Sequence, residues 1–492
     1  MRKSGILLHI TSLPSPYGIG TMGKAAYEFI DLLVKAGQSA WQVLPIGHTS
    51  YGDSPYQTYS SYAGNPYLID LDELSEDGLL ERDEYKDIFW GDSTERVDYK
   101  AIFENRLRIL KIAAAHLLEN EPFDYKVFLT ENAFWLSDYA HFMALKEMHG
   151  FNGRDTWEVS LRCKSTFSLA AADKKTVKLY EAIQYLFFRQ WSKLKRYAAS
   201  RNIDIIGDIP IYCASDSADV WAEPELFLLD GAFSPRVVSG CPPDAFSPLG
   251  QRWGNPIYDW AEHEKRGFSW WAKRLGFALK IYDSVKIDHF RGFESFYEIE
   301  ANEKTAENGR WRKGPGKKLF KALKEKLGGD LPLIAEDLGY LTDDVISLLK
   351  YTKYPGMKVL EFGFDARESG GYLPHTYPEN SVCYVGTHDN DTASGWYASI
   401  TDEEREKARI YFNITEEEGI SYGLMRGALA SPSFLAVLQM QDILNLGSEA
   451  RMNKPATEGG NWQWRMAGFA EFEKAAARLK KMTEVFERSA CK

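Results

Sequence analysis

Three acidic residues, each placed where a short apolar segment stops, are the first candidates for chemistry in this sequence. They are Asp288, Glu336 and Asp389. Core strands rarely end in such a concentration of charge, because burying an unpaired charged group costs several kcal/mol. Three strands that each carry a carboxylate at the same end therefore indicate one active site.

Two carboxylates in different protonation states are what cleavage of a glycosidic bond with retention of configuration requires. Glu336 follows apolar residues, and a setting of low polarity favours the protonated form that a general acid needs. Asp288 has Lys286, His289 and Arg291 as close neighbours in the sequence, and cations favour the ionised form that a nucleophile needs. We therefore expect Glu336 to act as the acid/base and Asp288 as the nucleophile.

Asp389, which follows His388, is the expected third member of this site. It would bind sugar hydroxyls and stabilise the positive charge that develops at the anomeric carbon. Two other interpretations stay open. A lone acidic residue is more often a helix N-cap or half of a surface salt bridge, and His289, His388, Asp389 and Asp391 could together bind a metal ion. The sequence contains no Gly-x-Ser-x-Gly motif and no phosphate-binding glycine loop.

Eight short apolar segments could position these residues. Most are apolar throughout rather than alternating, which is typical of parallel strands buried on both faces. Amphipathic helices lie between several of them, as in residues 24–35. This pattern predicts an α/β fold, a (β/α)₈ barrel, whose active site lies at the C-terminal ends of the strands. The expected strands are Ile6–Ile10, Ala40–Pro45, Ile203–Tyr212, Ile281–Asp288, Leu331–Asp337, Met357–Phe362, Val382–Asp389 and Phe434–Asp442.

Two long segments interrupt the expected barrel. Residues 48–200 are far too many for one crossover, so we expect an insertion that begins with a loop over the cleft and continues as a helical subdomain. Residues 214–260 are expected to form an irregular lid subdomain between the third and fourth strands. Residues 1–492 would thus be one catalytic barrel domain with two interruptions. The helices expected outside the barrel repeats are Tyr99–Glu119, Val127–Glu147 and Thr176–Ser200, with a helical ending over Gly468–Arg488.

Composition narrows the possible partners. The 492 residues carry a net charge of −11 and contain no basic tract, which argues against a nucleic acid or an anionic membrane as partner. Aromatic residues make up 14% of the chain and could fill the core or stack on sugar rings. The five cysteines lack CxxC spacing and predict neither a disulfide framework nor a zinc site. Without a signal-like segment or an apolar run near the ~20 residues of a membrane helix, we expect a cytoplasmic protein.

A series of short motifs runs through almost the whole chain, and their order resembles that of a known family. The motifs are Ser4–His9, Thr11–Pro14, Trp41–Pro45, Tyr51–Gln57, Gly207–Pro210, Gln251–Pro256, Ile287–Phe293, Ala335–Gly339, Thr387–Thr392, Gly447–Asn453 and Asn461–Arg465. The chain resembles the 4-α-glucanotransferases (amylomaltases, or disproportionating enzymes) of the α-amylase clan.

The resemblance implies a reaction and a set of site residues. A segment of an α-1,4-glucan would pass to the 4-hydroxyl of an acceptor glucan or glucose, through a covalent intermediate on Asp288. Glu336 would be the acid/base and Asp389 the transition-state stabiliser. No metal, no organic cofactor and no separate C-terminal β-domain would be needed, and the oligomeric state stays unknown. The implied substrate-binding residues are Ser54, Tyr56, Gln251, Trp253, Lys286, His289, Asp337, Asp365, His388, Asn390 and Asn461.

Two alternative functions stay open beside this one. Catalytic carboxylates alone do not separate a transferase from an α-glucan hydrolase. A catalytically impaired glucan-binding protein is also conceivable, because Lys286 stands where the clan usually has arginine. Ala245 stands where many family members have an aromatic residue, and its small side chain could open the lid and shift acceptor preference.

The position of Lys286 gives a first prediction. A guanidinium can hold two carboxylates at once in a rigid fork, whereas an ammonium is a mobile point charge. We expect an active enzyme with reduced or altered turnover, so Lys286→Arg should raise the rate of reaction with maltodextrins. An unchanged or lower rate would show that Lys286 is no handicap.

Overall fold

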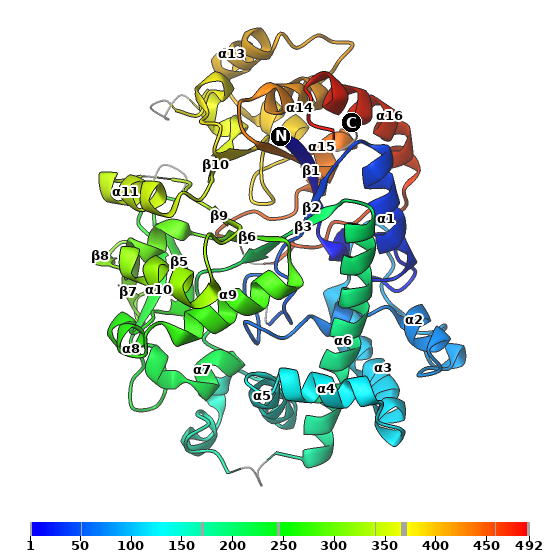
Figure 1. The fold of residues 1–492 in the computed structure, drawn as a ribbon, viewed down its shortest axis with the longest axis vertical. Helices are drawn as coiled ribbons and strands as arrows, with labels where there is room; N and C mark the ends of the chain where they lie inside the picture. Colours follow the sequence, from blue (N-terminus) through cyan, green and yellow to red (C-terminus); the bar gives the residue numbers. More distant parts are fainter. Residues whose placement is uncertain are drawn as a thin grey trace.

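A closed barrel of eight parallel strands forms the centre of the computed structural model, which describes residues 2–50, 52–168, 172–243, 247–339, 341–365, 371–457 and 459–489 (Figure 1). Each strand overlaps one of the eight predicted segments, and this confirms the predicted (β/α)₈ barrel. Around the barrel the strands are β1 (Lys3–Leu7), β2 (Ala40–Gln42), β3 (Asp204–Ile209), β6 (Ser284–Ile287), β9 (Leu333–Ala335), β10 (Gly356–Val359), β11 (Ser381–Tyr384) and β12 (Leu435–Gln439).

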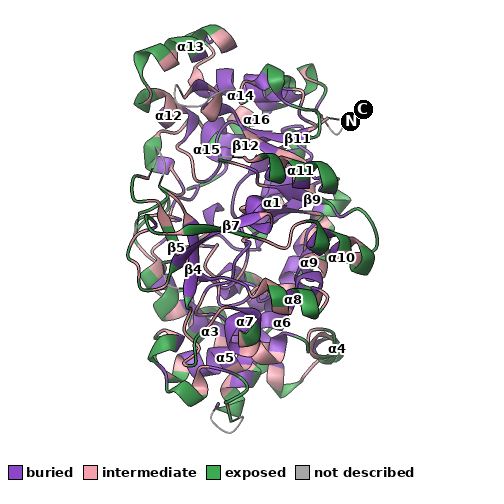
Figure 2. Ribbon diagram, turned by 90° about the vertical axis from the view of Figure 1, so that its left-hand side faces the viewer, coloured by how far each residue is buried: buried purple, intermediate pink, exposed green. Residues whose placement is uncertain are grey.

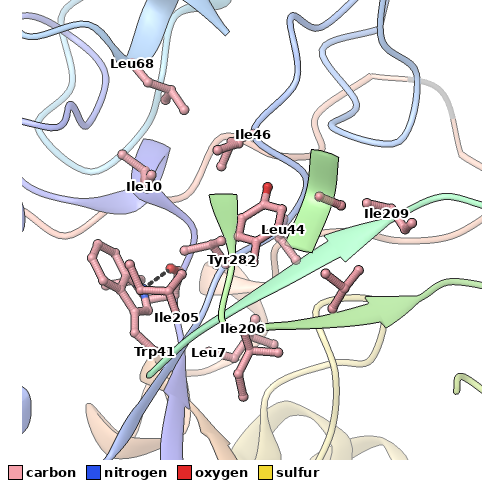
Figure 3. Packing of buried hydrophobic residues seen from close by; sticks show 14 of the residues in the cluster. Leu7, Ile10, Trp41, Leu44, Ile46, Leu68, Ile205, Ile206, Ile209 and Tyr282 are labelled. Carbon is pink, nitrogen blue, oxygen red and sulfur yellow. Dashed lines mark hydrogen bonds between the residues drawn. The ribbon is translucent and has the colours of Figure 1, made fainter. Parts of the chain in front are cut away.

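Close packing around β2 and β3 fixes the part of the barrel that leads to the site (Figure 3). Trp41, Ile206 and Tyr282 are buried in one apolar cluster, and the Trp41 indole N–H donates to the carbonyl of Leu8 at 2.8 Å. Gly207 lies directly against the Tyr282 ring, since a Cβ at this glycine would stand 2.2 Å from a ring carbon. β3 can therefore approach this ring only with a glycine at position 207.

The helices around the barrel follow the predicted apolar periodicity. Helix α1 (Lys24–Lys35) has the predicted bounds, and its buried residues recur at the spacing of one helix face. The predicted C-terminal helix is α16 (Ala470–Val485). The other helices that follow the barrel strands are α9 (Ser269–Ile281), α10 (Lys317–Leu327), α11 (Asp343–Thr352), α12 (Ala393–Ser399), α13 (Asp402–Phe412), α14 (Ile420–Ala430) and α15 (Met440–Ile443).

The insertion after β2 is helical, and Figure 1 shows it as the cyan and blue-green region at one end of the barrel. One predicted helix, Val127–Glu147, is in fact two. Asn132 ends α4 because its side-chain amide donates to the Phe128 carbonyl at 2.9 Å, which competes with continued helix. The helices are α2 (Leu71–Glu76), α3 (Tyr99–Glu119), α4 (Phe123–Glu131), α5 (Leu136–Met148) and α6 (Lys174–Ser200).

Buried polar side chains of the insertion hold the loop that follows β2. The Gln184 amide exchanges two hydrogen bonds with the backbone of Gly64, at 2.8 and 2.9 Å. Gln190, further along α6, does the same with Asp70 at 2.7 and 3.0 Å. His48 Nδ1 lies 2.8 Å from the Tyr139 hydroxyl of α5. The helical insertion thus fixes both ends of a loop that runs past the barrel mouth.

A second, antiparallel sheet stands beside the barrel and was not predicted. Its order is β5–β4–β7–β8, formed by β4 (Val237–Cys241), β5 (Gln251–Pro256), β7 (Ser295–Glu300) and β8 (Arg310–Lys313). The segment expected to be irregular therefore contains two strands and the short helices α7 (Ala218–Ala222) and α8 (Trp260–Lys265), while Ala245 lies outside the described residues. The sequence of strand β8 has no apolar pattern that would predict a strand. Ion pairs hold this strand instead, from Arg310 and Arg312 to Glu298 at 2.6 and 2.8 Å.

Buried residues run without interruption from the barrel into the insertion, as Figure 2 shows in purple. Within the described ranges, every helix is too short or too polar to cross a membrane.

The contact between Gly207 and Tyr282 gives a prediction for stability. Gly207→Ala forces a methyl group into the ring, and overpacking of this kind costs about 1–3 kcal/mol. The midpoint of urea denaturation should therefore fall. Gly231→Ala is the matched control, since a Cβ at Gly231 has no neighbour within 4 Å. Equal midpoints for the two variants would contradict this account of the packing.

Candidate active site

Asp288 and Glu336 stand side by side at the C-terminal ends of neighbouring strands. The amide of Asp288 donates to the carbonyl of Ile209 at 3.0 Å, and the amide of Glu336 donates to that of Ile287 at 3.1 Å. The strand ladder thus continues for one residue beyond β6 and β9, which holds both backbones in place. Their carboxyl groups interact, and each one shifts the pKa of the other.

Lys286 lies beneath these two carboxyl groups and binds a third one. Its Nζ is 2.6 Å from Glu336 Oε2, 2.9 Å from Asp208 Oδ2 and 3.3 Å from Asp288 Oδ1. The Lys286 side chain is 2% exposed, so the ammonium itself is shielded from water. Asp208 stands opposite Lys286 in the register of β3 and β6. No role for Asp208 was predicted from the sequence, although an acidic residue on a strand otherwise rich in isoleucine is a signal.

Burial and the neighbouring charges shift the pKa values of the two carboxyls in opposite directions. Burial and the negative charges of Glu336 and Asp208 raise the pKa of Asp288 well above its usual value, against the opposing charge of Lys286. Burial would also raise the pKa of Glu336, but the closer Lys286 ammonium and the hydrogen bond from Asp288 lower it instead. These directions give Asp288 the higher pKa of the two. From the sequence we expected the higher pKa on Glu336. The difference arises because Lys286 lies nearer to Glu336.

Asp389 lies on the turn after β11. Burial and the charge of Asp208 raise the pKa of Tyr56, and the negative charges of Asp288 and Asp389 add to this rise. The Asp389 side chain is 46% exposed, and His388 Nε2 is 3.4 Å from its Oδ1. The turn is held by Asn390, whose Oδ1 accepts from the amide and the hydroxyl of Thr387, both at 2.9 Å. Asn390, expected to contact substrate, therefore holds the backbone of the turn.

The loop anchored by the insertion brings Tyr56 into the site. Its hydroxyl donates to Asp208 Oδ2 at 2.7 Å, and its ring stacks on His388 at a centroid distance of 5.2 Å. Trp462 packs against both rings at 6.0 and 5.9 Å, although the sequence analysis gave it no role. Ser54 forms the turn before Tyr56, where its hydroxyl accepts from the Tyr56 amide at 3.3 Å. One face of Tyr56 is thus covered by His388.

The antiparallel sheet brings Trp253 to the other side of the site. The Trp253 ring meets His289 edge to face at 4.8 Å, and its indole N–H donates to Gln251 at 3.1 Å. His289 has φ of 52°, in the left-handed region that non-glycine residues rarely adopt, and such strain is typical of functional sites. Burial lowers the pKa of His289 to about 4, so its imidazole is neutral at physiological pH.

Three of the residues expected to bind substrate have structural partners instead of, or beside, an open face. Asp337 is 5% exposed and its Oδ1 accepts from the Met357 amide at 2.7 Å, which ties β9 to β10. Asn461 accepts from the Lys454 amide at 3.0 Å and shapes the loop before Trp462. Asp365 is half-buried at the end of a short 3₁₀ helix over Leu360–Phe364.

A metal ion was one alternative for the acidic and histidine residues. Among the residues that the structure describes, no three His, Cys, Asp or Glu side chains are grouped so that they could hold one. Asp391, one of the four candidates, instead accepts from the Ser448 hydroxyl at 2.8 Å.

Comparisons with known proteins give the family of this chain. A family model described as 4-alpha-glucanotransferase matches residues 8–471. The 4-alpha-glucanotransferase of Clostridium butyricum is 48% identical over 486 residues, which cover 98% of this chain and 100% of the relative. That of Thermus thermophilus is 46% identical and covers 99% of both chains.

A solved structure of similar length has the same fold. The amylomaltase from Streptococcus agalactiae, determined in complex with acarbose, superposes with a TM-score of 0.95 at 43% identity. The match covers 99% of this chain and 100% of that one. The chain belongs to the 4-α-glucanotransferase (amylomaltase) family and has the activity of that family.

Proposed function

We propose that this enzyme transfers a segment of an α-1,4-glucan to the 4-hydroxyl of an acceptor glucan or glucose, by double displacement through a covalent intermediate on Asp288. The donor and acceptor would be maltooligosaccharides, and the reaction would take place in the cytoplasm. Residues 1–492 would act as one catalytic domain, with residues 48–200 and 214–260 bordering the cleft. The observation that carries the proposal is that the Asp288 and Glu336 carboxyls both contact one buried ammonium, that of Lys286, at 3.3 and 2.6 Å.

The first displacement cleaves the donor. Asp288 attacks the anomeric carbon and forms a C–O bond, while the bond from that carbon to the leaving 4-oxygen breaks. Glu336 gives its proton to the leaving oxygen. For this step Glu336 must carry a proton and Asp288 must be ionised. Substrate binding would therefore have to reverse the order of the two pKa values. Lys286 is within reach of both carboxyls and would stabilise the newly ionised Asp288.

The second displacement completes the transfer. Glu336, now ionised, takes the proton of the acceptor 4-hydroxyl, and that oxygen displaces Asp288 from the anomeric carbon. Two inversions give net retention. Inverting glycosidases need carboxyls roughly 6.5–9.5 Å apart to admit a water molecule between them, whereas retaining enzymes have them closer. Both carboxyls lie within 3.3 Å of the Lys286 ammonium, and this closeness supports the retaining route.

Aromatic and polar residues around the pair support glucan binding. Asp389 Oδ2 would accept from sugar hydroxyls and stabilise positive charge at the anomeric carbon. Trp253 and the open side of Tyr56 would contact sugar faces, and the two histidines beside them, His289 and His388, would bind hydroxyls. Ser54, Gln251, Asp337, Asp365, Asn390 and Asn461 would shape these contacts, several of them through the backbone bonds described above.

The product pattern from maltotriose separates the possible functions. Transfer should give glucose together with a ladder of maltodextrins longer than the substrate, which chromatography over time will resolve. Only shorter sugars would indicate a hydrolase. Asp288→Asn and Glu336→Gln should each lower the rate at least about a thousandfold. Wild-type protein as inactive as Asp288→Asn would indicate a glucan-binding protein without catalysis.

The charge of Asp208 gives a prediction for pH dependence. Loss of the last proton from the Asp288–Glu336 pair should set the alkaline limb of kcat/KM, because Glu336 then has no proton to donate. Burial and the charge of Glu336 are the largest causes that raise the pKa of Asp288, and the negative charge of Asp208 adds to them. Asp208 therefore helps the pair to retain this proton. Asp208→Asn removes the charge but keeps an oxygen for Lys286 and Tyr56. The alkaline limb should therefore move to lower pH.

Asp204→Asn is the control for this experiment. It lies on the same strand as Asp208 but pairs with Lys3 at the surface, 48% exposed, so its pH profile should match that of the wild type. An Asp208→Asn profile with an unchanged alkaline limb, or one moved to higher pH, would contradict the proposed electrostatics.

A further inference from the structure

The carboxylate of Asp389 is held by a residue that comes from a different part of the chain. Asn453 Nδ2 donates to Asp389 Oδ1 at 2.6 Å, and the backbone amide of Asn453 donates to the carbonyl of His388 at 3.0 Å. Asn453 therefore binds both the side chain of Asp389 and the backbone immediately before it. It lies beyond β12, 64 positions from Asp389 in the sequence.

Arg451 fixes the backbone of the same turn. Its Nη2 donates to the carbonyl of Asp389 at 2.7 Å, while its Nε donates to the carbonyl of Asn453 at 2.7 Å. One guanidinium thus bridges the two backbones that carry the Asn453–Asp389 bond. The same side chain approaches Asp391 Oδ2 at 3.9 Å.

The residues after Asn453 connect this bond to the aromatic wall of the site. The amide of Trp462 donates to the carbonyl of Met452 at 2.7 Å, and the amide of Lys454 donates to Asn461 Oδ1. Residues 452–454 and 461–462 therefore face each other as a hairpin-like pair. Trp462, with φ of 65°, packs on His388, so the hairpin-like pair contacts the Asp389 turn on two sides.

We infer that Asn453 is a positioning residue for the reaction: its amide fixes Asp389 Oδ1 and so leaves Oδ2 directed to the sugar. This inference rests on the proposed role of Asp389 as the transition-state stabiliser. Asp389 needs such a partner because its side chain is half exposed and lies on a turn rather than on a strand. Without the bond the carboxylate can rotate, and a misplaced charge stabilises the transition state poorly.

An amide is the side chain that this position requires. It donates a hydrogen bond to the carboxylate without adding charge, so the negative charge of Asp389 is kept beside the developing positive charge. A carboxylate at position 453 would place two acids within hydrogen-bonding distance, and such pairs share a proton. The titratable and charged groups around Asp389 and Asn453 are His388, Tyr56, Arg451 and, through Arg451, Asp391.

The first test is Asn453→Ala, assayed with maltotriose. Loss of a hydrogen bond to a charged group in the transition state lowers a rate by about 10- to 100-fold. We therefore expect kcat to fall by this amount while KM changes less. Asn380→Ala is the matched control. Its side chain donates to the Lys353 carbonyl at 3.0 Å on an exposed surface, and its kcat should equal that of the wild type. Both variants should keep the thermal midpoint of the wild type to within a few degrees.

The second test is Asn453→Asp, which keeps the size of the side chain. At neutral pH the introduced carboxylate and that of Asp389 repel each other, whereas at acid pH the introduced group is protonated and can again donate to Asp389. The optimum of kcat should therefore move to lower pH, with partial recovery of the rate there. A merely structural role for Asn453 would leave the pH optimum unchanged in this variant.

Asp389→Asn separates failure of the inference from failure of the proposed function. If Asp389→Asn keeps the wild-type rate, the role of Asp389 and the inference about Asn453 are both wrong. If Asp389→Asn is inactive but Asn453→Ala is as active as Asn380→Ala, only the inference about Asn453 is wrong. Loss of activity in Asn453→Ala with a wild-type pH optimum in Asn453→Asp would also overturn it.

Discussion

A single buried ammonium is the constraint on which the site depends. Lys286 is almost fully enclosed, and a charge without partners in such a place would be very costly. It is stable there only because Asp208, Asp288 and Glu336 surround it, at or near the ends of three adjacent barrel strands. The order β3–β6–β9 around the barrel therefore determines which carboxyls can meet. The same charge lowers the pKa of Glu336 and opposes the rise in the pKa of Asp288.

Segments outside the barrel strands hold the remaining residues of the site in place. The helical insertion holds the loop that carries Tyr56, through paired amide bonds from Gln184 and Gln190. The antiparallel sheet carries Trp253 to the opposite wall. The turn after β11 is held from both sides, by Asn390 within the turn and by the segment of Arg451 and Asn453 from beyond β12. Tyr56, Trp253 and the turn after β11 are thus each held by a different segment of the chain.

Much of this architecture could be predicted because its signals are local. The barrel strands are continuous apolar runs, and Asp288 and Glu336 end two of them. Strands β7 and β8 could not be predicted, because ion pairs rather than apolar residues hold β8. The break at Asn132 depends on one side chain competing with a helix.

The roles of single residues were harder to predict than the elements that carry them. Asn453 gains its role from a contact between distant segments, which spacing does not reveal. Lys286 was interpreted as a weak substitute for arginine, yet its ammonium reaches three carboxylates; its effect on turnover stays a prediction.

Trapping the covalent intermediate tests the central claim most directly. Glu336→Gln treated with α-maltotriosyl fluoride, whose leaving group needs no acid, should accumulate the intermediate because no base activates an acceptor. Mass spectrometry of the digested protein should then find one maltotriosyl group on the peptide that contains Asp288, and the group should be absent when Asp288→Asn is added to the variant. Absence of the adduct, or its presence on Asp389 instead, would contradict the account.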